Sequence, residues 1–392
     1  MKRYLKITPE GTKDFLFAEC AAMDDVCGRI ETVFAGRGFK RVITPGIEFY
    51  DVFSLPCSGI AQEDMFKTTD NKGRLMVVRP DSTLPIARMV ATRLQHNLMP
   101  VRLYYKQAVY RNHPTLTGRR NENMQMGVEL LGVKGIRADL EILTTAVETL
   151  RAVATDFRVE LGHAEVFDAL SDELPIDDSY KEKIRLTIEG KNYSALNNLL
   201  DRLAPCRAVS AIRSLPSLFG GEEVFEQARA ICSGTKAADA LDYLHTVYSS
   251  LRSLGLGDKL IIDLGLVQRN DYYTGMVFTG YISGIGDAVL SGGRYDELLS
   301  EFDMPMGAAG FALDTDAVTL KTLADAEVSY SDNPDVLVFA ADGCEMQAIE
   351  QVAKLNATGK KAQFSVLPTL EETQAFAQQR GIKEVLTVGE SR

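Results

Sequence analysis

The sequence predicts an α+β fold, in which a large core of strands and helices precedes a small C-terminal α/β domain. Its 392 residues leave room for two or three domains, and a hydrophobic fraction of 45% is typical of globular cores. Two long strand patterns, residues 101–110 and 123–131, are joined by a polar loop. Beyond residue 334 strand and helix patterns alternate, which is the order of a parallel sheet.

Hydrophobic periodicity predicts the elements of the core in order. A helix is expected over residues 14–37, where Gly36 and Gly38 end it, and short β-rich runs follow. A mainly helical insertion is expected at about 164–255. The other expected helices are 83–97, 137–153 and 315–325. The expected strands are 39–50, 74–79, 101–110, 123–131, 259–263, 272–282, 287–291 and 307–313.

Residues 328–334 have the composition of a linker, which separates a core domain, 1–327, from a small domain, 335–392. The second domain begins with a strand pattern at 336–340 that is apolar on both faces. A helix, a strand near 362–366, a helix from 370 and a strand at 384–388 follow. This order predicts a small parallel sheet with helices.

Composition excludes several classes of protein. Lys and Arg number 43 and Asp and Glu 54, a net charge of −11 that argues against a surface built mainly to grip nucleic acid. No run approaches the ~18 apolar residues of a membrane helix, and Thr8 to Gly11 interrupt any signal peptide. The six cysteines form no Cys-x-x-Cys pair and there are four His, so we expect a cytoplasmic protein without a metal site or cofactor.

The densest chemical signal lies on the strand at 123–131. Side chains alternate along a strand, so Gln125, Gly127 and Glu129 share one face. Glycine between an amide and a carboxyl would leave a bare floor, on which a small zwitterion could lie. The alternative is a half-exposed strand whose polar face meets water.

Three further segments are ambiguous when each is taken alone. Asp81 and Thr83 precede a helix, so they suit a turn and an N-cap as well as a ligand. Tyr272 and Tyr273 precede a strand, where paired tyrosines are often core residues. The glycines of 292–293 are expected at a strand-to-helix junction, a weak phosphate-binding signal.

Taken together and in this order, these segments resemble the histidyl-tRNA synthetase family, and more closely its paralogues that act as regulatory subunits of ATP phosphoribosyltransferase. The similarity covers about residues 8–325 and includes the three class II motifs: residues 38–48, 110–132 and 310–317. It implies a class II aminoacyl-tRNA synthetase-like antiparallel sheet core. The C-terminal domain resembles a shortened anticodon-binding domain.

The resemblance implies a pocket for free histidine and assigns each residue a role. Asp81 and Thr83 would hold the α-amino group with Gln125 beside them, and Arg111 could contact the carboxylate. Glu129 would accept a hydrogen bond from the imidazole, and Tyr272 and Tyr273 would close the ring pocket. The full predicted set is therefore Asp81, Thr83, Arg111, Gln125, Glu129, Tyr272 and Tyr273.

The sequence departs from the synthetases where they bind ATP. The loop glutamate that meets adenine is replaced by His113, and the stacking phenylalanine by Asn123. Gln268 and Ala317 stand in place of two arginines. Each lost arginine removes a charge-assisted contact of about 2–3 kcal/mol. We therefore expect no adenylation.

Charged residues near the third motif bear on the same site. Acidic Asp314 and Asp316 beside position 317 are expected to repel a triphosphate. Arg119 and Arg120 suggest either contact with an anionic partner or a solvated basic loop.

The resemblance implies a non-catalytic subunit that assembles with a short catalytic ATP phosphoribosyltransferase subunit, binds L-histidine for feedback control, and forms a dimer within a hetero-oligomer. No tRNA or membrane partner is expected. The rival hypotheses are a histidine-activating ligase or true synthetase, and a histidine- or RNA-binding module outside biosynthesis.

Overall fold

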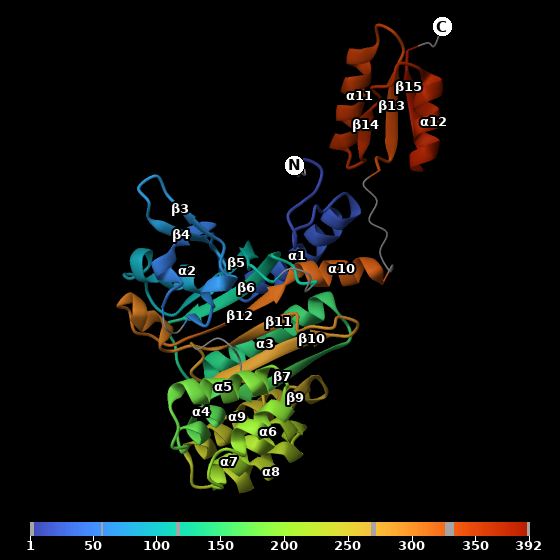
Figure 1. The fold of residues 1–392 in the computed structure, drawn as a ribbon. Coiled ribbons are helices and arrows are strands. Elements are labelled where there is room, and N and C mark those ends of the chain that lie inside the picture. The colour runs from blue at the N-terminus through green and yellow to red at the C-terminus, as the bar shows by residue number, and fades with distance from the viewer. Residues whose placement is uncertain (1–3, 56–57, 115–117, 268–271, 326–332, 390–392) are drawn as a thin grey trace. The chain divides into compact units, whose positions relative to one another are not determined.

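The computed structural model describes residues 4–55, 58–114, 118–267, 272–325 and 333–389. The chain divides into two compact units, one of residues 1–14 and 22–327 and the other of residues 15–21 and 328–392. Figure 1 labels most of the elements of both units. Part of the expected linker, residues 328–332, lies outside the described residues.

A nine-stranded sheet forms the first unit's centre, in the order β1-β5-β6-β12-β11-β10-β7-β9-β8. The neighbouring strands run antiparallel except for the pairs β1–β5 and β7–β9. The predicted α+β core is thereby confirmed. The strands are β1 (Lys40–Arg41), β5 (Val101–Tyr110), β6 (Glu122–Leu131), β7 (Phe157–His163), β8 (Phe219–Gly220), β9 (Leu260–Asp263), β10 (Met276–Ile282), β11 (Leu290–Arg294) and β12 (Ala308–Asp314).

Strands β5 and β6 form the long hairpin at the middle of the site. Their register runs from Val101 opposite Leu131 to Tyr110 opposite Glu122. Every second residue of β5 is buried, starting at Leu103, as the alternation of a strand requires. The expected pair of strands at 101–110 and 123–131 is confirmed.

Helices cover both faces of the large sheet. One face packs against α1 (Ala18–Gly36), α3 (Ile136–Val153) and α10 (Thr315–Ala324), and apolar residues of alternate strand positions fill the layer between them. The other face meets α2 (Thr83–Arg93) and the short helix Leu298–Phe302. A small antiparallel sheet adjoins α2, made of β2 (Ile47–Phe49), β3 (Lys67–Thr69) and β4 (Leu75–Val78).

The insertion is mainly helical, as the sequence predicts, and packs below the large sheet (Figure 1). Its helices are α4 (Ala164–Ser171), α5 (Asp178–Glu189), α6 (Tyr193–Leu200), α7 (Arg207–Ser214), α8 (Glu223–Cys232) and α9 (Lys236–Ser253). Strand β7, which leads into the insertion, was not predicted. Its buried positions Phe157, Val159 and Leu161 alternate with more exposed Arg158 and Glu160.

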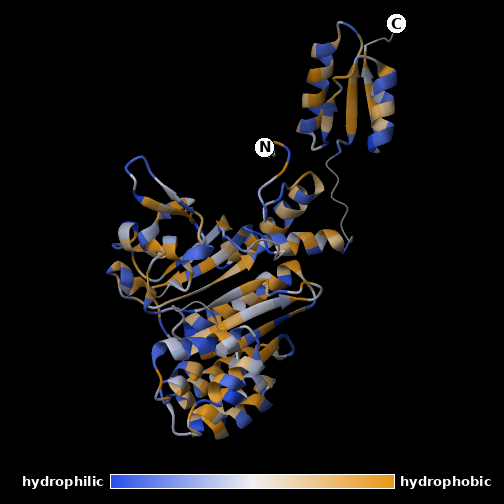
Figure 2. Ribbon diagram, in the orientation of Figure 1, coloured by the Kyte–Doolittle hydropathy of each residue, from blue (hydrophilic) through white to orange (hydrophobic). Residues whose placement is uncertain are grey.

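The second unit contains a three-stranded parallel sheet in the order β14-β13-β15. Its strands are β13 (Val336–Ala340), β14 (Ala362–Phe364) and β15 (Glu384–Val388), and its helices are α11 (Glu345–Ala357) and α12 (Leu370–Arg380). Val338 of β13 packs toward α11 and Leu337 toward α12, so this strand is apolar on both faces. Its ribbon has the hydrophobic colour in Figure 2. The predicted β-α-β-α-β order is confirmed.

Two features are absent from the described ranges. None of the helices there is long and apolar enough to cross a membrane. The same residues contain no group of three or more His, Cys, Asp or Glu side chains that could hold a metal ion.

Candidate functional site

Strand β6 separates a polar face from a core face, as predicted. Met126, Val128 and Leu130 are at most 3% exposed and belong to the main core. The expected bare floor at Gly127 is wrong, however, because a Cβ there would lie 2.5 Å from the Tyr105 hydroxyl oxygen. Tyr105 stands directly opposite on β5, and its side chain covers the glycine. The glycine therefore makes room for a tyrosine of the protein.

Glu129 is the buried centre of the polar face, with 1% of its surface exposed. Thr83 Oγ1 donates a hydrogen bond of 2.9 Å to Oε1, and the Tyr295 hydroxyl donates to Oε2. Gly310 lies opposite on β12, where a Cβ would be 2.0 Å from Oε2. Glycine at this position is what allows the carboxyl to lie flat against the sheet.

Burial raises the pKa of Glu129 to about 8. Hydrogen bonds from Tyr295 and Thr83 lower that pKa, and the Asp81 charge raises it further. The carboxyl is therefore largely protonated at neutral pH in the empty site. A ligand N–H or cation placed against it would favour the ionised form.

Three buried tyrosines surround this carboxyl. The Tyr272 ring packs edge-on against Tyr295 at 5.6 Å and against Tyr273 at 4.9 Å. Burial raises the pKa of Tyr105, Tyr272 and Tyr295 well above the usual value, so they remain neutral hydrogen-bond donors. The contact between Tyr295 and Glu129 was not predicted, although its segment, 292–296, was singled out. The glycines of that segment are also not at a junction, because β11 contains both.

Asp81 and Arg111 lie at the start of α2, beside Thr83. Asp81 Oδ1 accepts a 3.0 Å hydrogen bond from the Leu84 amide, so this side chain caps the helix. Burial raises the pKa of Asp81, while the charges of Arg111 and Arg79 lower it. Arg111 Nε donates to the Pro80 carbonyl at 3.2 Å. Thr83 is the first residue of the helix and uses its hydroxyl on Glu129, not as a cap.

Arg79 holds this loop in place. It is 5% exposed, and its guanidinium donates to the carbonyl of Ala108 at 2.7 and 3.0 Å and to that of Thr44 at 2.9 Å. A further bond of 3.1 Å reaches Gln107 Oε1. Gln107 lies opposite Gln125, which also faces Asp314 of β12. Gln125 is thus on the predicted face but toward the far end from Glu129.

A hollow of about 740 Å³ lies at the end of the site that the resemblance assigns to adenine. Phe66, Val78 and Tyr110 contribute apolar surface, and His113 and Arg119 lie at its wall. Asn123, the other adenine-side replacement, lies on β6 opposite Val109. Gln268 and Asp271 lie outside the described residues.

Asp314 and Asp316 were expected to repel a triphosphate. Both carboxylates are instead engaged in contacts within the protein. Asp314 caps α10 by accepting from the Asp316 and Ala317 amides at 3.0 Å. Asp316 is 3% exposed, accepts from the Met124 amide at 3.0 Å and pairs with Arg120 Nη1 at 2.9 Å. Arg120 thus forms an internal ion pair, which neither of the two interpretations of the sequence included.

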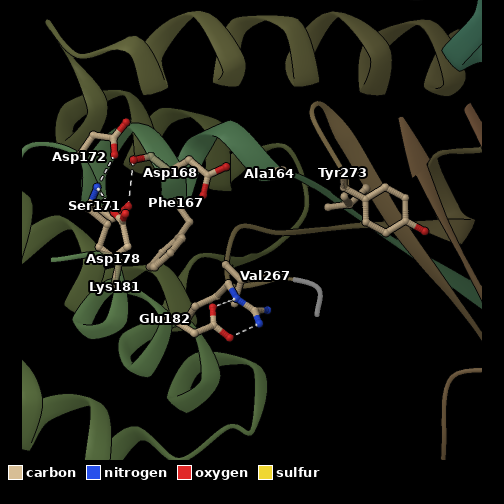
Figure 3. Close-up of a pocket in the computed structure, with 12 residues that line it drawn as sticks. Ala164, Phe167, Asp168, Ser171, Asp172, Asp178, Lys181, Glu182, Val267 and Tyr273 are labelled. Carbon is tan, nitrogen blue, oxygen red and sulfur yellow. Dashed lines mark hydrogen bonds and ion pairs between the residues drawn. The ribbon is translucent and has the colours of Figure 1, made fainter. Parts of the chain in front are cut away.

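A second hollow, of about 420 Å³, lies between the sheet and helices α4 and α5 of the insertion (Figure 3). Tyr273 stands on its sheet side. On the insertion side, Lys181 pairs with Asp172 at 2.7 Å and Arg185 with Glu182 at 2.7 Å. Because these cations are paired with acids, this wall does not have the basic character of a nucleic-acid surface. Tyr273 separates the hollow from the tyrosine cluster.

The comparisons with known proteins agree with this architecture. The family model described as "Histidyl-tRNA synthetase" matches residues 11–318. A histidyl-tRNA synthetase structure from Nostoc sp. PCC 7120 has a TM-score of 0.77 at 21% identity, covering 96% of this chain and 90% of its own. Fold and site therefore define a class II aminoacyl-tRNA synthetase-like protein.

More specific relatives cover nearly the whole chain. An ATP phosphoribosyltransferase regulatory subunit from Clostridium acetobutylicum is 36% identical over 390 residues, 98% of this chain and 95% of that protein. A crystal structure from Bacillus halodurans C, titled as an ATP phosphoribosyltransferase regulatory subunit/histidyl-tRNA synthetase, has a TM-score of 0.87 at 29% identity and full coverage of both chains. The chain belongs to the family of ATP phosphoribosyltransferase regulatory subunits.

Proposed function

We propose that the site binds L-histidine. The observation that carries the proposal is the buried Glu129 carboxyl, with hydroxyl donors on both oxygens and tyrosine rings around it. An imidazole N–H aimed at this carboxyl gains a charge-assisted hydrogen bond. A ligand without that donor would leave the Glu129 carboxyl in its protonated form and would forgo this bond, which contributes about 1.5–3 kcal/mol.

The amino-acid end of histidine fits the opposite polar groups in this proposal. Asp81 would accept hydrogen bonds from the α-amino group, with Thr83 and Gln125 beside it. Arg111 would contact the α-carboxylate, since no adenylate forms there. Support comes from the position of Asp81, Thr83 and Arg111 around the start of α2, next to Glu129.

In the same proposal the chain is a non-catalytic subunit required by a short catalytic ATP phosphoribosyltransferase subunit, in the first step of histidine biosynthesis. Histidine bound here would inhibit the complex. Inhibition requires that histidine binds one quaternary state better than another. Support comes from the family and from Ala317, Asn123 and His113 at the nucleotide end. The proposal includes no tRNA.

A second candidate is a histidine-activating ligase, which the hollow of about 740 Å³ at the nucleotide end favours. An ATP–pyrophosphate exchange assay separates the two functions. We expect exchange at background level with histidine present. Exchange that depends on histidine and rises above background would establish the ligase and remove the proposal of a non-catalytic subunit.

Self-association as a dimer is also part of the proposal. Ile47 and Phe49 point to the same face of β2 and are 50% and 43% exposed, next to Ile43 at 71%. Exposed apolar clusters of this kind are typical of interaction surfaces. Phe49→Asp should shift the chain toward monomer in sedimentation, whereas Leu98→Asp, at a 92% exposed position elsewhere, should not.

Calorimetry of the isolated full-length chain tests the pocket directly. Glu129→Ala should abolish histidine binding, because it removes the imidazole acceptor. Glu148→Ala is the matched control, since Glu148 is paired with Arg37 at 2.6 Å on the helix α3 surface. Unchanged histidine affinity in Glu129→Ala would refute the assignment of the pocket.

A further inference from the structure

A buried ion pair joins strand β11 to helix α3 directly behind the candidate site. Arg294 Nη2 lies 2.5 Å from Asp139 Oδ1, and the two side chains are 7% and 0% exposed. Arg294 Nη1 lies 2.9 Å from Asp296 Oδ1. A pair this deep is expensive to break, because either partner alone would be an uncompensated buried charge. It therefore fixes α3 and β11 in one arrangement.

The insertion contacts the same network through a tyrosine hydroxyl. Tyr243 of α9 donates to the second carboxyl oxygen, Oδ2, of Asp139. Its ring meets the edge of His163 at 5.9 Å, where β7 leads into the insertion. His163 is 9% exposed, and its Nδ1 has no hydrogen-bond partner among the described residues. Tyr243 thus joins the insertion to the core at a partly buried polar contact.

The other end of the network is the proposed histidine pocket. Arg294 is followed in the chain by Tyr295, whose hydroxyl donates to Glu129. A displacement of Tyr295 by a ligand at Glu129 therefore acts on the backbone that carries Arg294. The contacts run without a break from Glu129 through Tyr295, Arg294 and Asp139 to Tyr243.

The insertion has room to respond. Hollows of about 420 and 360 Å³ lie beside α5, and Glu182 and Arg185 line both. Tyr273 borders the first and Tyr50 the second, so both hollows separate the insertion from the core. Close packing resists displacement, and these are places where it is missing. The α9 side, in contrast, is held by apolar packing in the main core and by the Tyr243 contact.

We infer that Tyr243 is a positioning residue that couples the Glu129 pocket to the helical insertion through Asp139 and Arg294. This inference rests on the proposed function, because it names the route by which bound histidine changes the complex. Tyr243 itself touches no ligand. It sets the position of the insertion relative to the pocket, and its hydroxyl is the part that acts.

The test compares Tyr243→Phe with wild type in two assays. Calorimetry of the full-length chain measures histidine affinity, and the complex reconstituted with the catalytic subunit gives the histidine concentration for half-inhibition. We expect the Kd to stay within about twofold, and the half-inhibiting concentration to rise at least about fivefold, the lower limit of typical allosteric coupling. Tyr180→Phe is the matched control, because the Tyr180 hydroxyl bonds the Leu199 carbonyl at 2.9 Å inside the insertion.

Different results would refute the coupling role of Tyr243, the proposed binding of histidine, and the path through α9. Half-inhibition unchanged in Tyr243→Phe, or shifted equally by Tyr180→Phe, refutes the coupling role. Failure of wild type to bind histidine refutes the proposed function on which the coupling rests. Hydrogen exchange of the wild-type chain gives a test without a variant. Bound histidine should slow amide exchange in α9 and leave exchange in α12 unchanged. The same exchange rate in α9 with and without histidine would refute the path through α9.

Discussion

Replacing Glu129 by glutamine removes the carboxyl whose pKa burial raises to about 8, from an ordinary value of 4.5. A carboxyl with a raised folded-state pKa binds its proton more tightly in the folded chain than in the unfolded one. Its contribution to stability is therefore fully present below pH 4.5 and is lost as the pH rises through 8. Glutamine, which does not titrate, removes this loss.

The size of the effect follows from the two pKa values. Between pH 6.5 and pH 9 the linkage amounts to about 2 kcal/mol of unfolding free energy. Urea unfolding followed by tyrosine fluorescence measures it. The chain has 14 tyrosines and no tryptophan, and every tyrosine except Tyr330 lies within residues 1–327, so the signal reports the first unit.

Other groups also titrate in this range, so the quantity to compare is the difference between variants. Wild type should lose about 2 kcal/mol more than Glu129→Gln on going from pH 6.5 to pH 9. Glu148→Gln serves as control, because the bond to Arg37 lowers the pKa of Glu148 and the residue is ionised across the whole range. Equal pH dependence in wild type and Glu129→Gln would show that Glu129 is already ionised at neutral pH in the empty site, so that burial does not raise its pKa.

Two further substitutions test the packing of the site. Arg120→Ala leaves buried Asp316 without its cation and should cost about 1–2 kcal/mol of stability in urea unfolding, after allowance for the partial exposure of Arg120. Arg202→Ala, at an exposed position in the insertion, should stay within about 0.5 kcal/mol, and equal costs would contradict the pairing. Gly310→Ala places a methyl group against the buried Glu129 carboxyl, so it should cost at least about 2 kcal/mol of stability and abolish histidine binding. Gly286→Ala is the control, because a methyl group there meets open space. Normal histidine affinity in Gly310→Ala would refute the packing described.

The strands and helices with strong periodicity were predictable from the sequence. The β5–β6 hairpin, helices α2, α3 and α10, and the alternating C-terminal unit all lie within a few residues of their expected positions. Strand β7 was missed although Phe157 to Leu161 alternate between apolar and charged residues, because this alternation covers only five residues between a predicted helix and the insertion. The double glycine at 292–293 suggested a strand-to-helix junction, yet close approach of Phe311 and Tyr273 requires glycine inside β11.

The strand face that carries the candidate site was predictable from the sequence, but the side chains that contact this face were not. Alternation alone places Gln125, Gly127 and Glu129 on one side of a strand. That Tyr105 fills the space above Gly127 depends on the register between β5 and β6, which no local pattern contains. The contact of Tyr295 with Glu129 joins residues 166 positions apart, and the pairing of Arg120 with Asp316 is likewise long-range.

The most direct test of the proposed function is phosphoribosyltransferase activity reconstituted from this chain and a short catalytic subunit, with and without histidine. We predict no activity from this chain alone, activity when the two are combined, and inhibition by histidine that disappears in Glu129→Ala. Full activity of the catalytic subunit without this chain, or inhibition that persists in Glu129→Ala, would contradict the proposal.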